Sequence, residues 1–81
     1  MTDNKVLTDA LQPAELLQQL IRFDTTNPPG NEKPCIDFID QILQQAGIQT
    51  QIVARNPNRP NLIARYPGQG HAPPFLMYGH V

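Results

Sequence analysis

The chain has 81 residues, a formal net charge of −1, and 40% hydrophobic and 16% charged residues. This length allows one small domain at most, and the near-neutral charge argues against the basic surface that nucleic acid or an anionic membrane requires. No segment is apolar for long enough to span a bilayer and the lone cysteine cannot form an internal disulfide, so we expect a soluble cytoplasmic protein.

The first part of the chain predicts one helix between two irregular segments. Residues 1–12 are mostly polar and predict a flexible lead-in. Pro13 suits the first position of a helix, where its missing N–H costs nothing. We expect an amphipathic helix from Pro13 to about Phe23, followed by a proline-rich loop over Asp24–Asn31. The apolar residues at helical spacing are Leu16, Leu17, Leu20 and Ile21.

A second helix is predicted between Asn31, a good N-cap residue, and Gly47, which suits the position after a helix. Cys35 lies on its apolar face, which indicates a small core residue rather than a nucleophile. Asp37 and Asp40 lie on the other face, where solvated charge explains them better than acid–base chemistry. The apolar face consists of Cys35, Ile36, Ile39, Ile42, Leu43 and Ala46.

Three strands are expected in the second half of the chain. Ile48–Arg55 alternates apolar and polar residues and indicates a half-buried strand near an edge. Asn61–Tyr66 is a second short strand. Phe75–Val81 begins with four apolar or aromatic residues without polar alternation, which is typical of a strand buried on both faces. The fold class is therefore α/β, with two N-terminal helices followed by three strands and the helices on one face of the sheet.

Few residues in this half suggest chemistry. The scattered Arg55, Arg59 and Arg65 are interpreted as solvated surface charges. His71 lies among Gly, Pro and Ala at a hairpin tip and is also interpreted as a surface residue. His80 follows a glycine at the carboxyl end of the third predicted strand, where ligands collect in open α/β sheets. It is either a polar residue that ends a strand or a metal ligand on a rigid element.

Four stretches resemble, in the same order, the zinc-dependent family of aminoacylases, acetylornithine deacetylases and succinyl-diaminopimelate desuccinylases. Phe75–Val81 is similar to the start of the Gly-His-x-Asp signature of that family. Leu16–Glu32 resembles its first helix and its Thr/Ser-x-Pro…Glu loop. Phe38–Gly47 resembles its second helix, and Arg59–Gly68 its Asn-Leu-x-Ala strand and the turn after it. Together the resemblance covers residues 13–81 almost completely.

The resemblance implies that residues 13–81 are the N-terminal part of a zinc-exopeptidase-like α/β catalytic domain, truncated at its first metal-ligand motif. His80 matches the first zinc-binding histidine, and no catalytic residue is carried over. Glu32 matches a position that looks structural. The family implies two Zn²⁺ ions, or the related Co²⁺ or Mn²⁺. It also implies that the aspartate after Val81, the general base, the other ligands and a dimerisation domain lie beyond residue 81 in a homodimeric full-length protein.

The activity implied by the resemblance is hydrolysis of the amide bond of an N-acyl amino acid or a small peptide by a metal-activated water. We expect the 81-residue chain itself to be inactive, because one histidine cannot hold two metals. We also expect it to be poorly soluble, because Phe75–Val81 would form an exposed apolar edge. The alternative is a complete, non-enzymatic α/β module whose C-terminal strand docks on a partner protein.

Overall fold

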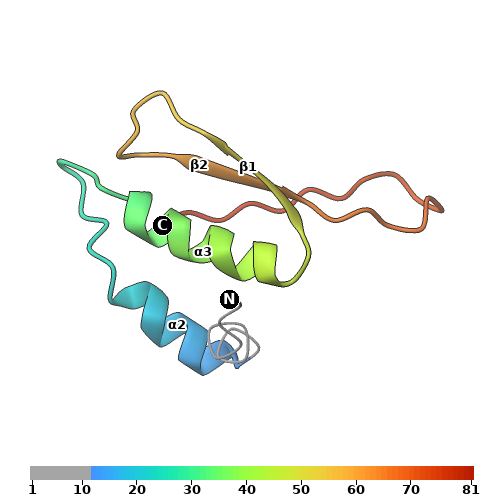
Figure 1. Ribbon diagram of the computed structural model, residues 1–81, viewed down its shortest axis with the longest axis horizontal. Coiled ribbons are helices and arrows are strands. Elements are labelled where there is room, and N and C mark those ends of the chain that lie inside the picture. Colours follow the sequence, from blue (N-terminus) through green and yellow to red (C-terminus); the bar gives the residue numbers. More distant parts are fainter. Residues whose placement is uncertain (1–11) are drawn as a thin grey trace.

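The computed structural model describes residues 12–81 as a small α/β unit with a two-stranded antiparallel sheet (Figure 1). The predicted lead-in lies outside the described residues, apart from Gln12. Within residues 12–81, no helix has both the length and the apolar character needed to cross a membrane. The regular elements, in chain order, are α2 (Pro13–Ile21), α3 (Lys33–Gln45), β1 (Gln49–Val53) and β2 (Asn61–Arg65).

Helix α2 lies against the rest of the fold with little burial. It begins with Pro13 and ends two residues before the predicted end, and none of its residues is buried. Just beyond it, the ring of Phe23 packs on Phe38 of α3, with ring centroids 5.4 Å apart and planes tilted by 44°. Leu17 and Ile21 remain exposed on its surface. The predicted helix is confirmed, but its apolar face is only partly covered by the described chain.

Helix α3 supplies the small core and ends as predicted. Cys35 and Ile36 are the buried hydrophobic residues of the described chain. At its C-terminus Gly47 has φ +79°, a left-handed conformation that glycine adopts without steric cost. The N–H of Gly47 donates to Gln44 O at 3.0 Å, and the N–H of the next residue donates to Leu43 O at 2.9 Å. These two bonds form a Schellman motif, which satisfies the last carbonyls of the helix.

The hairpin of β1 and β2 places one face on α3. In its register Thr50 lies opposite Ala64 and Ile52 opposite Leu62, and residues opposite each other share a face of the sheet. Leu62 is half-buried and lines a cleft together with residues of α3. The other face carries the exposed Ile63. The first two predicted strands are formed, and α3 covers one side of them (Figure 1). The prediction that the first is half-buried is wrong for most of β1, because Thr50 alone of its five residues is half-buried and Ile52 is exposed.

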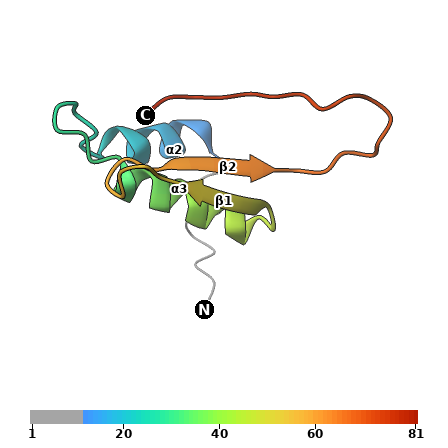
Figure 2. The same cartoon turned by 90° about the horizontal axis from the view of Figure 1, so that it is seen from above.

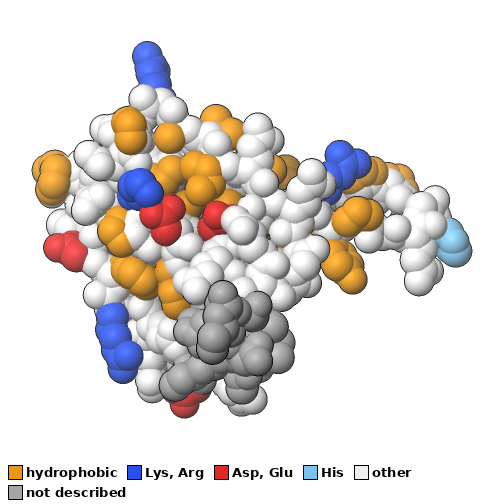
Figure 3. Space-filling view, in the orientation of Figure 1, with side chains coloured by type: hydrophobic (Ala, Val, Ile, Leu, Met, Phe, Trp, Pro, Cys, Tyr) orange, Lys and Arg blue, Asp and Glu red, His pale blue; other side chains and the backbone are white. Residues whose placement is uncertain are grey.

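The predicted third strand is not formed in the described structure. After β2 the chain projects as an arm with hydrophobic side chains on its surface (Figure 3) and then runs back on the side of β2 opposite to β1 (Figure 2). The four residues from Phe75 to Tyr78 are 80–95% exposed, so the prediction of burial on both faces is wrong here. A strand is buried only by neighbouring strands and covering layers, and no strand of residues 12–81 pairs with this segment.

Candidate functional site

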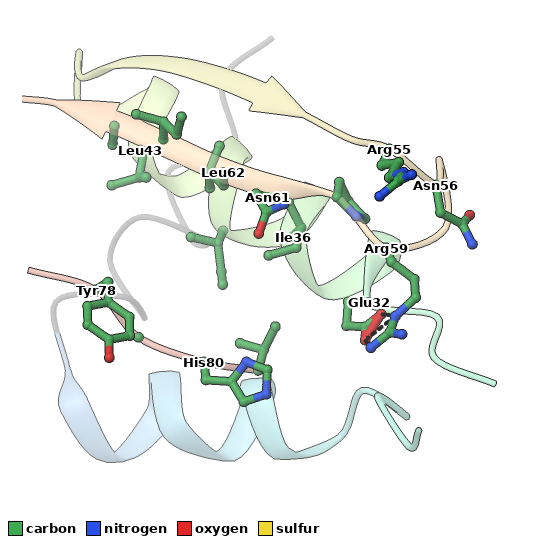
Figure 4. A pocket seen from close by; sticks show the side chains of 16 residues that line it. Glu32, Ile36, Leu43, Arg55, Asn56, Arg59, Asn61, Leu62, Tyr78 and His80 are labelled. Carbon is green, nitrogen blue, oxygen red and sulfur yellow. Dashed lines mark hydrogen bonds and ion pairs between the residues drawn. The ribbon is translucent and has the colours of Figure 1, made fainter. Parts of the chain in front are cut away.

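The terminal segment, β2 and α3 enclose a cleft of about 810 Å³ (Figure 4). Its floor is apolar and consists of Ile36, Ile39 and Leu43 of α3. One wall is Asn61–Ala64 of β2 and the other is Tyr78–Val81 of the terminal segment. The charged side chains of Glu32, Arg55 and Arg59 gather at the end where β2 begins (Figure 4), so the cleft combines an apolar middle with a charged end.

The charged end is organised by an ion pair between Glu32 and Arg59 (Figure 4). Arg59 Nε donates to Glu32 Oε1 at 3.1 Å and to Oε2 at 3.2 Å, and Arg59 Nη2 lies 3.1 Å from Oε1. Glu32 is 7% exposed, which makes it the buried charged residue of the described chain. The hydrogen bond from Arg59 holds the pKa of Glu32 below its ordinary value of 4.5, and His80 contributes a smaller electrostatic effect in the same direction.

Arg59 is exposed, as the sequence predicts, but it is not a purely solvated charge, because it is paired with a buried carboxylate. Arg59 is followed by a proline and a strand, so its side chain is fixed at the mouth of the hairpin loop and reaches across to Glu32. Arg55 and Arg65 are exposed, as expected. Sequence reasoning treated the three arginines as one group, because nothing local distinguishes the one that faces a buried carboxylate.

The loop before α3 shapes one side of the ion pair. Asp24 Oδ1 accepts a hydrogen bond from the Thr26 N–H at 3.1 Å, and the Thr26 carbonyl accepts one from the Gly30 N–H at 2.9 Å. Gly30 is buried and has φ +83°. A Cβ built on Gly30 would lie 2.5 Å from Arg59 Nε. The arginine therefore packs directly on the glycine backbone, and only glycine leaves it that space.

The hairpin loop shapes the other side. The Arg59 N–H donates to Asn56 O at 2.8 Å, and the Asn58 N–H donates to Asn56 Oδ1 at 3.0 Å, which closes a tight turn. The Lys33 N–H donates to Asn58 O at 3.2 Å. One of the free N–H groups at the start of α3 is thus satisfied by this loop, which fixes Arg59 relative to the helix.

The start of α3 differs from the prediction that Asn31 is the N-cap residue. The helix begins at Lys33 and the cap position is held by Glu32, whose side chain makes no capping hydrogen bond. The Glu32 carbonyl accepts the first helical bond from Ile36 at 2.9 Å. The Glu32 carboxylate is engaged by Arg59 instead, so a tertiary contact displaces the local capping preference.

His80 also lines the cleft and is exposed. Figure 4 shows its ring across the cleft from β2, with the Glu32–Arg59 pair further along the cleft. Three protein ligands are usual for a catalytic zinc. Residues 12–81 contain no group of three His, Cys, Asp or Glu side chains that could hold a metal ion. The described residues alone therefore do not fit the zinc site that the resemblance implies for His80.

The other candidate residues take structural or surface positions. His71 is exposed in the arm after β2, as expected, and it does not line the cleft. Cys35 is 1% exposed, and its burial raises the pKa of the thiol, which confirms it as a core residue. Asp37 is exposed and pairs with Lys33, with Nζ 2.6 Å from Oδ2.

Asp40 corrects the prediction of a fully exposed acidic face. It is half-buried, because it follows the buried Ile36 by four residues and therefore lies on the same side of α3. Its Oδ2 accepts a hydrogen bond from Gln44 Nε2 at 2.8 Å. Within the described part of the chain, its Oδ1 is buried without a hydrogen-bond partner.

No family model, no curated protein and no solved structure matches this chain. The family resemblance therefore rests on the four sequence stretches and on the residues they contain.

Proposed function

We propose that this chain contributes the first metal-binding histidine, His80, to a zinc-dependent amidohydrolase or exopeptidase. Its substrate is an N-acyl amino acid or a small peptide. The other metal ligands and the general base come from residues outside 1–81, because a catalytic zinc takes three protein ligands. The bound metal, Zn²⁺ or the related Co²⁺ or Mn²⁺, supplies an activated water for attack on the amide carbon. A cytoplasmic, homodimeric full-length enzyme with a zinc-exopeptidase-like fold is part of this proposal.

The observation that carries the proposal is that three of the resembling stretches line one cleft. The loop that resembles the Thr/Ser-x-Pro…Glu motif brings Glu32. The stretch that resembles the Asn-Leu-x-Ala strand brings Arg59 and Asn61, and the stretch that resembles the Gly-His motif brings His80. Residues far apart in the sequence thus gather where a site is proposed, and Glu32 and Arg59 lock two of the stretches together.

The decisive experiment uses the full protein encoded by the gene. Reading the gene onward from the codon for Val81 should give an aspartate first. The purified protein should contain zinc and hydrolyse members of a panel of N-acetyl amino acids. His80→Ala should lower metal affinity and kcat/KM by at least about a hundredfold. Loss of a residue that only hydrogen-bonds to a metal ligand costs up to about a hundredfold, and loss of the ligand itself should cost at least as much.

His71→Ala is the matched control, because it removes an exposed histidine that does not line the cleft. It should leave zinc content and hydrolysis unchanged. If His80→Ala kept its full zinc content and full activity, His80 would not be a metal ligand. Hydrolysis by the 81-residue chain with added metal would contradict the need for ligands from outside it.

The second candidate is a non-enzymatic α/β module whose terminal segment docks on a partner protein. The exposure of Phe75–Tyr78 favours it, because contiguous exposed apolar side chains mark interaction sites. Sequencing the gene onward from the codon for Val81 also distinguishes the two proposed functions. A stop codon directly after Val81 in an intact transcript would favour the docking module, and an aspartate in an open frame would favour the hydrolase.

A further inference from the structure

We draw no further inference here: the strongest candidate, the contiguous exposed apolar patch that Phe75–Tyr78 form on the terminal segment beside the cleft, carries no proposal, because nothing in the structure of residues 12–81 shows what covers it.

Discussion

Arg59 Nε donates hydrogen bonds to both carboxylate oxygens of Glu32, at 3.1 Å to Oε1 and 3.2 Å to Oε2. The two residues are 27 positions apart in the sequence. This contact joins the loop before α3 to the hairpin loop between β1 and β2. The carboxylate is buried while the guanidinium is partly open to solvent. Removal of the arginine would leave a buried charge without its partner, which is more costly than the loss of an exposed pair.

The Glu32–Arg59 pair should make the stability of the chain depend on pH. Because the folded pKa of Glu32 is lowered, its contribution is fully present above the ordinary value of 4.5 and is lost as the pH falls through the folded pKa. We expect Glu32→Gln to lower Tm by several degrees at pH 7, and this difference should shrink between pH 5 and pH 3. Thermal unfolding followed by circular dichroism across this range measures it.

Asp37→Asn is the control for that series, because it removes an exposed carboxylate paired with Lys33. It should change Tm little at any pH. Some acid sensitivity should remain in Glu32→Gln, since hydrogen bonds from Thr26 also lower the pKa of Asp24. A difference between the native chain and Glu32→Gln that stays constant down to pH 3 would show that the charge of Glu32 is not stabilising.

Gly30→Ala should destabilise the chain through both its backbone and Arg59. The left-handed conformation at φ +83° costs a non-glycine residue about 1–2 kcal/mol. In addition, the new Cβ would lie 2.5 Å from Arg59 Nε and 2.8 Å from its Cζ, so the guanidinium must move away from Glu32. Urea denaturation gives the free energy of unfolding of each variant.

Gly47→Ala is the matched control for Gly30→Ala. Gly47 has φ +79°, but a Cβ there would meet nothing within 4 Å. It should show only the backbone cost. Equal losses in the two variants would mean that the ion pair tolerates displacement of Arg59.

The two ends of α3 show what local sequence can and cannot predict. Its C-terminus was predictable because all the groups that end the helix are close in the sequence. They are the left-handed Gly47 and the two Schellman hydrogen bonds. Its N-terminus was not, because Asn31 is locally the better cap, while the carboxylate of Glu32 is bound by an arginine from a distant loop. The Glu32–Arg59 pair joins residues 27 positions apart, and such a pair produces no periodic pattern from which it could be predicted.

The terminal segment shows a different limit. An uninterrupted apolar run such as Phe75–Tyr78 predicts a buried strand only if neighbours exist on its edges and faces. In the described chain those neighbours are absent, so the same side chains are exposed. The cleft was also unpredictable from the sequence, because α3, β2 and the terminal segment, which are distant in the sequence, line it together. The alternation in β1, by contrast, was sufficient to place that strand.

Cys35 should react slowly with thiol reagents while the chain is folded. Its side chain is almost completely buried, and burial raises the pKa of the thiol, so both access and the thiolate fraction are reduced. We expect modification by iodoacetamide at pH 8 to be at least about tenfold slower in buffer than in 6 M urea. Rates that match in the two solvents would place the thiol at the surface.

Phe23→Ala should release α2 while leaving the hairpin intact. The ring of Phe23 packs on Phe38 at 5.4 Å, and α2 itself has no buried residue. The ring pair contributes about 0.5–1.5 kcal/mol beyond its buried area. Amide exchange should therefore speed up in α2 and stay unchanged in β1 and β2. Leu17→Ala, an exposed position on α2, is the control, and an equal effect of both variants would contradict a specific role for the ring pair.

The exposed run Phe75–Tyr78 should make the chain associate as its concentration rises. Its four side chains are 80–95% exposed and contiguous, which favours contact between apolar surfaces of different molecules. Replacing Leu76 and Tyr78 by lysine should keep the chain monomeric to higher concentration in light scattering. The control places lysines at Gln69 and Ala72, which adds the same charge but leaves the apolar run intact. If both double variants raise solubility equally, net charge alone limits it and the exposed run is not the contact surface.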